Sequence, residues 1–365
     1  MKMGCCVLAL GVAAALLPGC GGENETNVDE TQATHMKRSS EPQDTTEASP
    51  ERSPKPRKKP KAPKPSPKLR SLNVTLDGYE GPENVGIVMA VERGYFEDAG
   101  LDVGIVFAPA SPLITVKYIV DRSTDIAVTN QPQVAIAKDK KAPIVAVDTL
   151  VRQPTAAMIW LRSSGISDIA DLKGKTIAIP GLPFQREFLK SILKRAGLTL
   201  GDVKVEFVGY DLISSLVSGS ADAIFGGSWN VEGIELKARG MHPVVTRAKD
   251  LGLPAYDELV LITRTDYASK KPKVVRDFIA AVTRGTAAAI KDPKGAIEAI
   301  EKATEANFEA TPNATKAGVK ATLPLLSKSG YISPDQANKL VGWMFEEGMI
   351  QSKPATSALQ TNAYR

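Results

Sequence analysis

Cysteine is confined to the extreme N-terminus of this 365-residue chain, where Cys5, Cys6 and Cys20 are the only ones. The remainder of the chain therefore has no disulfide, thiol nucleophile or cysteine metal ligand. Histidine is nearly as scarce, because only His35 and His242 are present. A histidine zinc site or a Ser-His-Asp triad after residue 70 would depend on His242 alone. We therefore expect no metal, no cofactor and no catalytic residues of these classes.

Long hydrophobic runs are also missing after residue 20, where no stretch approaches the about 18 apolar residues of a membrane-spanning helix. The apolar stretch 7–17 follows Lys2, and this order is typical of an export signal. It ends in LPGC at 17–20, which resembles a bacterial lipobox. We expect a signal peptide over residues 1–19 and lipidation at Cys20, which would hold the protein outside the cytoplasm on the cell membrane. The alternative is an ordinary secretory signal in which Cys20 is incidental.

Residues 20–70 are predicted to be a disordered tether rich in proline and lysine. Their last part, 51–70, contains nine Lys/Arg and one Glu among closely spaced prolines, which favours an extended spacer. Residues 1–70 hold 12 of the 46 Lys/Arg and 8 of the 41 Asp/Glu, so the rest of the chain is nearly neutral. The basic pI is therefore local, and we expect no nucleic-acid binding.

After residue 71 the hydrophobic period alternates between two and 3.6, which predicts an α/β fold with largely parallel sheets. Strand patterns cover 72–77, 101–108, 124–130 and 142–151, and a helix is predicted over 84–100. A clean amphipathic helix is predicted over 183–197, and Gly197 ends it. The stretch 156–165 reads as a connecting strand, and 256–265 as a strong strand that returns to the first lobe.

Two lobes joined by two crossings follow from this order of elements. We expect lobe 1 to begin with residues 71–159, lobe 2 to comprise 160–255, and lobe 1 to be completed by the return strand and C-terminal helices of 256–365. A ligand cleft would then lie between the lobes, at the carboxyl ends of the strands.

Five stretches in this order resemble the NMT1/THI5-like family of the type II periplasmic-binding-protein superfamily, the family of thiamine-pyrimidine binders. They are VTLDGYEGPENVGIVMAVERGYFEDAGLDVGIV, DIAVTNQPQVAIA, DLKGKTIAIPG, SLVSGSADAIFG and WNVEGIELKARG. The resemblance covers about Leu72 to Ile300. It implies the two-lobed substrate-binding fold of ABC importers.

The function that this resemblance implies is that of a lipid-anchored, extracytoplasmic solute-binding protein that closes around a thiamine-precursor pyrimidine or a similar small heterocycle. Its partners would be an ABC permease and a separate ATPase, and we expect a monomer. The same architecture also serves binders of riboflavin, alkanesulfonate, taurine and nitrate. A tethered sensor that does not transport is a further alternative.

This chain departs from the family pattern in the loop before the first helix. Gly78 stands where the pyrimidine binders usually have tryptophan, and Asn84 stands where they have histidine. One branch of the family consists of pyrimidine-precursor synthases that use their own histidine, a lysine-bound PLP and a cysteine-rich motif. The scarcity of cysteine and histidine argues against an enzyme here.

The resemblance places Trp229, Asn230 and Glu232 at the cleft edge of lobe 2. An indole offers a stacking face, and a carboxylate accepts two N–H groups from an aminopyrimidine edge, with an amide beside them. The alternatives are a packing role for Trp229 and a helix N-terminal charge for Glu232.

Further ligand-binding candidates stand near predicted strand ends, helix starts and the return crossing. Phe184 could equally belong to the core, and Glu258 is favoured as a hinge residue. These candidates are Tyr79, Glu80, Asn84, Ser111, Thr129, Asn130, Gln131, Phe184, Gln185 and Tyr256.

Overall fold

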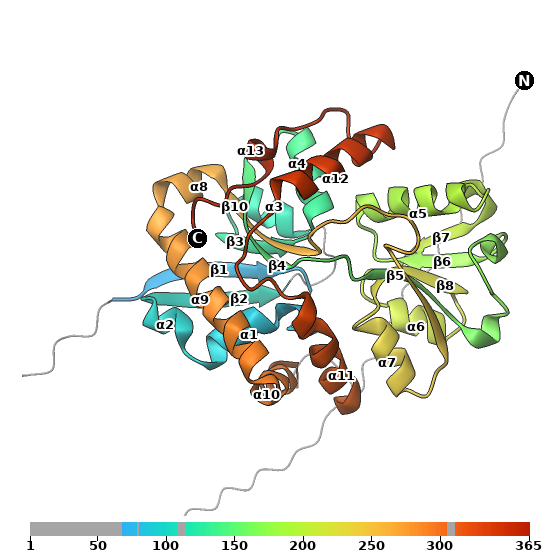
Figure 1. Cartoon of the computed structure of the whole chain (residues 1–365), viewed down its shortest axis with the longest axis horizontal. Coiled ribbons are helices and arrows are strands. Elements are labelled where there is room, and N and C mark those ends of the chain that lie inside the picture. Colours follow the sequence, from blue (N-terminus) through green and yellow to red (C-terminus); the bar gives the residue numbers. More distant parts are fainter. Residues whose placement is uncertain (1–67, 79, 108–113, 305–310) are drawn as a thin grey trace, which may run out of the picture. The chain divides into compact units, whose positions relative to one another are not determined.

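The computed structural model describes residues 68–78, 80–107, 114–304 and 311–365. The predicted signal peptide, Cys20, nearly all of the predicted tether, and the candidates Tyr79 and Ser111 lie outside the described residues. Among the described residues the strands form two five-stranded sheets, flanked by helices (Figure 1). The predicted α/β class with a two-sheet architecture is confirmed.

The first sheet has the strand order β2-β1-β3-β10-β4. Its strands are β1 (Arg70–Leu76), β2 (Leu101–Phe107), β3 (Ile126–Thr129), β4 (Ile144–Val151) and β10 (Leu259–Arg264). β1 pairs in parallel with β2 and β3, whereas β10 is antiparallel to both β3 and β4. Every residue of β3, β4 and β10 is buried, as expected for strands covered on both faces. The predicted return strand therefore lies inside the first sheet.

The second sheet has the order β7-β6-β8-β5-β9. Its strands are β5 (Ala156–Leu161), β6 (Thr176–Ile179), β7 (Lys204–Phe207), β8 (Ala223–Ser228) and β9 (Pro243–Arg247). β6 is parallel to β7 and β8, and β5 is antiparallel to β8 and β9. We call the parts of the chain built on the two sheets the first lobe and the second lobe.

The boundary between the two lobes lies a few residues earlier in the chain than predicted. The prediction that lobe 1 extends to residue 159 is wrong for β5, because Ala156–Leu161 is hydrogen-bonded into the second sheet. The apolar run AAMIWL is buried there, with Trp160 only 2% exposed. The first crossing between the lobes is therefore the short segment 152–155, and the second is 248–258.

Short helices follow the strands in both lobes. The parallel strands require such crossover connections. In the helix α5 (Pro183–Arg195), Phe184, Phe188 and Ile192 are buried on one face at helical spacing, and Gly197 follows the helix with a φ of 75°. The helices that precede the return strand are α1 (Val85–Glu92), α2 (Tyr95–Asp98), α3 (Ile114–Val120), α4 (Gln131–Asp139), α5 (Pro183–Arg195), α6 (Leu212–Val217) and α7 (Glu232–Ala238).

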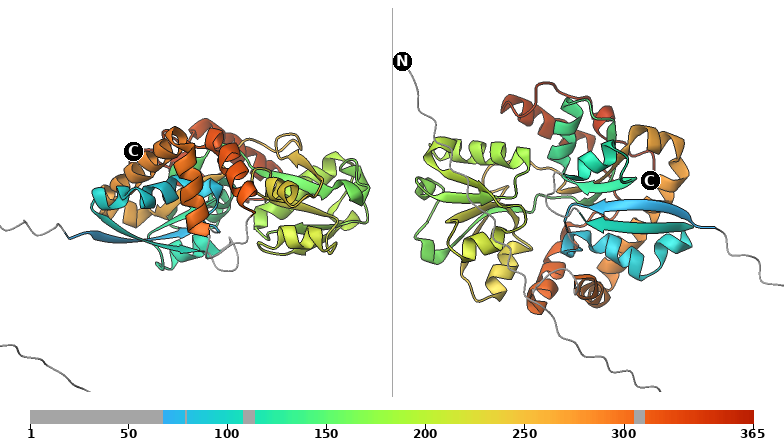
Figure 2. Two further views of the ribbon diagram at one scale, coloured as in Figure 1. Left: turned by 90° about the horizontal axis from the view of Figure 1, so that it is seen from below. Right: turned by 180° about the vertical axis from the view of Figure 1, so that it is seen from behind.

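The described C-terminal part after β10 is helical. It contains α8 (Thr265–Lys270), α9 (Pro272–Lys291), α10 (Pro293–Thr304), α11 (Pro312–Thr322), α12 (Pro334–Glu346) and α13 (Thr356–Leu359). Short 3-10 turns are η1 (Pro82–Asn84), η2 (Arg162–Ser164), η3 (Ala170–Leu172), η4 (Leu200–Asp202) and η5 (Leu323–Leu325). α9 lies alongside α1 (Figure 2), and a Cβ atom at Gly285 would stand 2.0 Å from the Gly86 carbonyl oxygen. This contact requires glycine at position 285.

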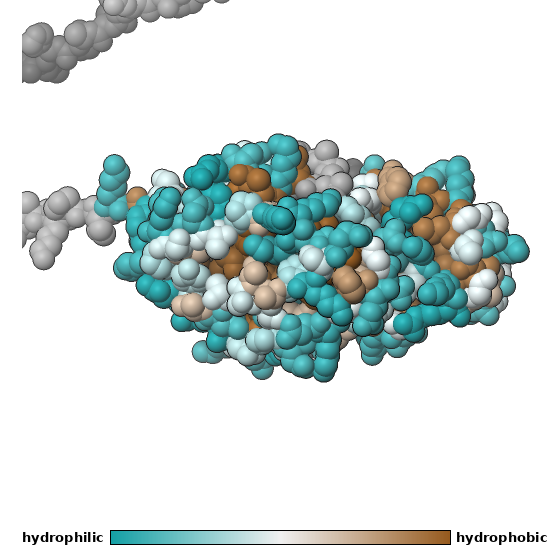
Figure 3. Space-filling view, turned by 90° about the horizontal axis from the view of Figure 1, so that it is seen from above, coloured by the Kyte–Doolittle hydropathy of each residue, from teal (hydrophilic) through white to brown (hydrophobic). Residues whose placement is uncertain are grey.

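Apolar packing continues from one lobe to the other. One cluster of buried residues contains Val260 and Ile262 of the first sheet together with Ile177 and Phe225 of the second. Tyr256, which is fully buried in the second crossing, belongs to the same cluster. Hydrophilic residues cover most of the face shown in Figure 3, and hydrophobic residues form separate smaller areas. None of the helices in the described residues has the length and apolar character needed to cross a membrane.

Candidate functional site

The main candidate site is a cavity to which both sheets contribute. Its empty volume, including the open mouth, is about 800 Å³. Residues from the loops after β1, β3, β6, β7 and β8 line it, so it lies where these strands end. This is the position expected for a ligand in open α/β sheets. The lining residues are Asp77, Gly78, Gly81, Pro82, Glu83, Asn84, Asn130, Pro180, Leu182, Gln185, Gly209, Tyr210, Leu212, Gly226, Ser228, Val231, Glu232, Glu258 and Leu259.

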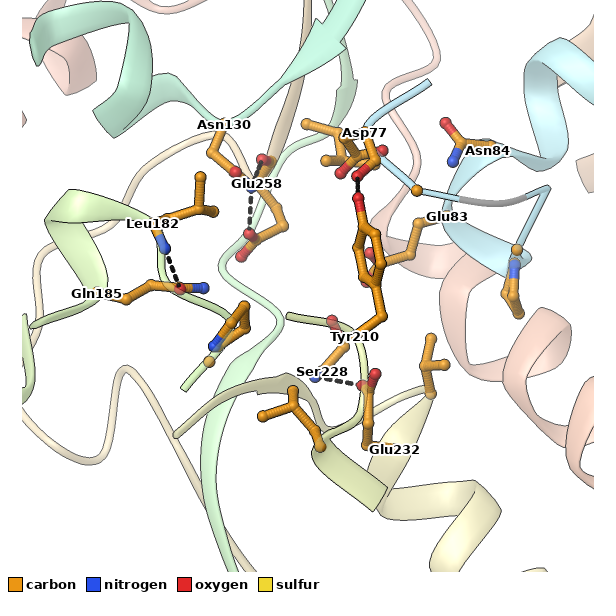
Figure 4. A pocket seen from close by; sticks show the side chains of 18 of the residues that line it. Asp77, Glu83, Asn84, Asn130, Leu182, Gln185, Tyr210, Ser228, Glu232 and Glu258 are labelled. Carbon is orange, nitrogen blue, oxygen red and sulfur yellow. Dashed lines mark hydrogen bonds between the residues drawn. The ribbon is translucent and has the colours of Figure 1, made fainter. Parts of the chain in front are cut away.

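Four carboxyl groups dominate the polar lining of the cavity. Asp77, Glu83 and Glu258 come from the first lobe and its crossing, and Glu232 comes from the second lobe (Figure 4). Among the described residues, no Lys, Arg or His lines the same cavity. Nor do the described residues include any group of three or more His, Cys, Asp or Glu that could hold a metal ion. The cavity therefore favours ligand groups that donate hydrogen bonds or carry positive charge.

Burial raises the pKa of all four carboxyl groups. The pKa of Glu83 is raised to about 8, first by burial and then by the charges of Glu258 and Asp77. The pKa of Asp77 is raised to about 6 by burial, and hydrogen bonds offset part of this effect. Burial also raises the pKa of Glu232 and of Glu258. Because like charges are costly in a shielded cavity, a ligand that donates protons or brings positive charge would relieve this repulsion.

Glu258, in the second crossing, is held by hydrogen bonds from Asn130 at the end of β3 and from Thr155 in the first crossing. The Asn130 side-chain amide donates 2.8 Å hydrogen bonds to the Glu258 Oε1 atom and to its carbonyl oxygen. The backbone N–H of Thr155, in the first crossing, donates to Glu258 Oε2 at 2.7 Å. Glu258 thus lines the cavity and also connects the two crossings, and its role as a hinge residue stays a prediction.

Glu232 is the first residue of α7, and its carboxylate turns back toward the preceding strand. The backbone N–H of Ser228 donates to Glu232 Oε2 at 2.6 Å. This hydrogen bond fixes the carboxylate at the wall of the cavity (Figure 4). A carboxylate held in this way retains acceptor capacity for a ligand, because its two oxygens offer about four lone-pair sites.

The sequence matches the family model described as NMT1/THI5 like over residues 81–296, more than half of the chain. The chain belongs to the NMT1/THI5-like family. It is 34% identical over 241 residues to the formylaminopyrimidine-binding protein of Halalkalibacterium halodurans, which covers 66% of this chain and 73% of that protein. It is 26% identical over 235 residues to the 4-amino-5-hydroxymethyl-2-methylpyrimidine phosphate synthase of Uromyces fabae, covering 61% of this chain and 68% of the synthase.

Solved structures share the fold of this NMT1/THI5-like protein. The alkanesulfonate-binding protein SsuA from Xanthomonas axonopodis pv. citri, bound to MOPS, superposes with a TM-score of 0.64 at 16% identity. The superposition covers 82% of this chain and 100% of that one. At this identity the likeness concerns the fold, and it confirms the predicted periplasmic-binding-protein type II architecture.

Several residues predicted for the site of this NMT1/THI5-like protein do line the cavity. They are Asn84, Asn130, Gln185 and Glu232. The Gln185 side-chain oxygen accepts a 3.1 Å hydrogen bond from the backbone N–H of Leu182, which fixes the start of α5. Contact of these four residues with a ligand remains a prediction.

Trp229 lies outside the set of residues that line the cavity. Its half-buried indole packs against the apolar cluster of the second lobe, and the Arg247 guanidinium carbon stands 3.8 Å from the ring centroid. Ser228, Val231 and Glu232 line the cavity, whereas the indole is engaged by Arg247 of β9. The structure therefore favours the packing role for this tryptophan.

Asn230 is also absent from the cavity lining, yet it connects the lobes. It is fully buried, and its side-chain amide donates to Glu83 Oε1 at 3.1 Å and to Thr322 Oγ1 at 2.7 Å. Both acceptors belong to the part of the chain that surrounds the first sheet, while Asn230 follows β8 of the second. Its position indicates a role in holding the lobes together.

The remaining described candidates lie in the core or beside the cavity. Phe184 and Tyr256 each pack edge-to-face on Phe188, with ring centroids 5.1 and 5.8 Å away. Thr129 is buried in β3, and the Gln131 side-chain oxygen accepts from the backbone N–H of Asp257. Glu80, Thr129, Gln131, Phe184 and Tyr256 are not among the residues that line the cavity.

Asp77, Glu83, Tyr210 and Glu258 line the cavity but are missing from the predicted ligand-binding set. Asp77 directly follows β1, and Tyr210 follows β7 by a few residues. The same strand-end argument that selected Asn130 would have found both of them. Glu83 sits in the 3-10 turn η1 and had no comparable signal, because its contact with Asn230 comes from the other lobe.

Proposed function

We propose that this NMT1/THI5-like protein is the extracytoplasmic solute-binding component of an ABC importer, and that its cavity takes a thiamine-precursor pyrimidine or a similar heterocycle rich in N–H donors. The observation that carries this proposal is the set of four carboxyl groups in the cavity, without a cationic side chain among its described lining residues. The 34% identity to a formylaminopyrimidine-binding protein supports the same class of ligand.

An aminopyrimidine suits this lining chemically. Its exocyclic amino group supplies two N–H donors, and its basic ring nitrogens accept a proton. Glu232 and Glu258 are fixed carboxylates that accept such hydrogen bonds, and hydrogen bonds to charged groups contribute about 1.5–3 kcal/mol each. The Tyr210 ring, which also lines the cavity, offers an apolar face to a flat heterocycle.

The anionic alternatives fit this cavity poorly. Alkanesulfonates, taurine and nitrate present negative oxygens, which require cationic side chains or several N–H donors. Carboxyl groups that are ionised in this cavity repel such ligands, and no cationic side chain among the described lining residues offsets that repulsion. The structural likeness to an alkanesulfonate-binding protein therefore does not extend to its ligand. Riboflavin has an uncharged ring, so the charge of the lining does not separate it from a pyrimidine. The titration described below does so.

A pyrimidine synthase is the alternative from another functional class. That chemistry, as the family implies it, uses a histidine, a PLP lysine and a cysteine-rich motif. The described lining residues of this cavity include neither histidine nor lysine. The relative with a binding-protein name is also more similar than the Uromyces fabae synthase, at 34% against 26% identity. These observations support a binding protein that is not an enzyme.

The transport mechanism that we propose depends on the connection of the two lobes by two crossings. Ligand binding at strand ends of both lobes favours the closed arrangement, because only that arrangement makes both sets of contacts. In this proposal a monomer in the closed form docks on a permease whose ATPase is a separate protein. Lipidation at Cys20 would keep the protein at the membrane. Replacement of Cys20 by serine should release it from the membrane fraction, and retention of the variant there would contradict lipid anchoring.

Isothermal titration of the purified chain tests the proposed ligand class. The titrants are 4-amino-5-hydroxymethyl-2-methylpyrimidine, riboflavin and taurine, at neutral pH and moderate salt. We expect the pyrimidine to bind with a Kd of about 1 μM or lower, equivalent to at least about 8 kcal/mol, and taurine not to bind. Binding of taurine without binding of the pyrimidine would overturn the proposal.

A further inference from the structure

Tyr210 reaches from the second lobe to the first across the cavity. It follows β7, and its hydroxyl donates a hydrogen bond to the carbonyl oxygen of Asp77, which follows β1 (Figure 4). The side chain is 41% exposed, so it is not part of either apolar core. It nevertheless lines the cavity together with Asp77 and Gly78. An exposed aromatic residue held by one contact to the opposite lobe is well placed to respond to ligand binding.

Gly78 provides the space that this ring uses. A Cβ atom at Gly78 would stand 3.6 Å from Cε1 of Tyr210 and 3.9 Å from its Cζ and hydroxyl oxygen. These are ordinary van der Waals distances, so alanine would fit beside the ring. Any longer side chain at position 78 that extends from Cβ toward the ring would meet Tyr210. Glycine at 78 and tyrosine at 210 therefore form a matched pair across the two lobes.

A second connection between the lobes is independent of Tyr210. The Asn230 amide joins the second lobe to Glu83 and Thr322, as described above. The Asn230 contact is buried, whereas the Tyr210 contact is at the accessible side of the cavity. Opening of the lobes must break both contacts, but local movement of the Tyr210 loop would break only one. Exchange at the Asn230 segment therefore reports opening rather than loosening of the Tyr210 loop.

We propose that Tyr210 is a positioning and specificity-determining residue that latches the closed cavity through Asp77 and forms an aromatic wall in the space left by Gly78. The choice of ligand class rests on the proposed function, whereas the latch does not. The hydroxyl supplies the latch, and the ring supplies the wall against a flat ligand. The two parts can be removed separately, by Tyr210→Phe and by Tyr210→Ala.

The latch is tested without ligand by hydrogen–deuterium exchange of the full chain. Loss of one neutral hydrogen bond changes an equilibrium by about two- to tenfold. We expect Tyr210→Phe to raise exchange in the peptide around Asn230 by that factor, with no change in thermal unfolding. Tyr331→Phe is the matched control, because Tyr331 is 40% exposed and does not line the cavity. Unchanged exchange at the Asn230 peptide in Tyr210→Phe would overturn the latch.

The wall is tested by titration with 4-amino-5-hydroxymethyl-2-methylpyrimidine. We expect Tyr210→Phe, which removes only the hydroxyl, to weaken binding, and Tyr210→Ala, which also removes the ring, to weaken it further. Gly78→Leu should weaken binding, because a side chain that extends from Cβ toward the ring meets Tyr210. In the double variant Gly78→Leu with Tyr210→Ala, the two losses should not add, because both act on the same ring. Additive losses would overturn the pairing of Gly78 with Tyr210.

Failure of the two proposals can be told apart. If the natural protein does not bind the pyrimidine, the proposed ligand class fails, and the exchange measurement still decides the latch. If the natural protein binds the pyrimidine and Tyr210→Ala binds it equally well, the wall fails and the proposed function stands.

Discussion

Asn230 and Glu83 are 147 residues apart in the chain and are joined by a 3.1 Å hydrogen bond between the lobes. The same amide of Asn230 also donates to Thr322. Neither partner is close in sequence, so this contact forms only when the β8 loop of the second lobe meets the η1 turn and α11. It provides a specific connection between the two lobes.

Replacement of Asn230 by alanine should lower both stability and ligand affinity. The variant removes the donor to the half-buried Glu83 and to the buried Thr322 side chain, and an unsatisfied buried polar group costs about 1–3 kcal/mol. Urea unfolding and pyrimidine titration measure the two effects. Asn313→Ala, at an exposed position of α11, is the control and should change neither. Equal stability of the two variants would contradict the assigned role of Asn230.

The stability of the protein should fall as pH rises through the titration range of Glu83. The pKa of this group is raised from 4.5 to about 8 in the folded protein. Between these values the folded protein retains a proton that the unfolded chain has released, so the free energy of unfolding decreases with increasing pH. Urea unfolding across this range measures the slope. Glu83→Gln should reduce the slope, whereas Glu301→Gln, at an exposed position, should not.

Gly285 and Gly342 provide a matched pair of helix glycines. A Cβ at Gly285 would meet the Gly86 carbonyl oxygen at 2.0 Å, whereas a Cβ at Gly342 would meet nothing within 4 Å. Gly285→Ala should therefore destabilise the fold by about 1–3 kcal/mol through overpacking of α9 against α1. Gly342→Ala should stabilise it by about 0.5–1 kcal/mol, because alanine favours the helix. Thermal unfolding distinguishes these outcomes, and destabilisation by both variants would contradict the packing argument.

Trp229→Ala should lower stability without changing ligand affinity. The indole packs in the second lobe and lies against Arg247, and an exposed cation–π contact contributes about 0.5–1 kcal/mol beyond the packing. Chemical unfolding and titration with the pyrimidine separate the two readouts. A large loss of affinity in a variant of normal stability would contradict the packing role and support contact of Trp229 with the ligand.

The elements were largely predictable because their signals are local. The α5 helix has its apolar residues at helical spacing, and the β10 run is buried throughout in the structure. Strand ends also located part of the cavity, including Asn130, and the family resemblance located Glu232. The direction of a side chain in the turn after β8 is not local, because it depends on Arg247 from another strand. For that reason the sequence predicts Trp229 in the cleft, whereas in the structure its ring lies against Arg247.

Asn230 illustrates a second limit of prediction from sequence. The sequence predicts ligand contact for Asn230, but its side-chain partners come from the other lobe and from a C-terminal helix. No periodicity or spacing in the sequence indicates contacts over such separations. The carboxyl cluster was missed for the same reason, since Asp77, Glu83, Glu232 and Glu258 are brought together only by the fold.

The most direct test of the central claim is titration of 4-amino-5-hydroxymethyl-2-methylpyrimidine into the natural protein and its Glu232→Gln and Glu301→Gln variants. Glu232 lines the cavity, and Glu301 is an exposed residue of α10. Loss of a hydrogen bond to a charged acceptor should weaken binding to Glu232→Gln by at least about tenfold, and Glu301→Gln should bind as the natural protein does. The same affinity for all three proteins, or no binding by any, would contradict recognition of an N–H-rich ring by the cavity carboxylates.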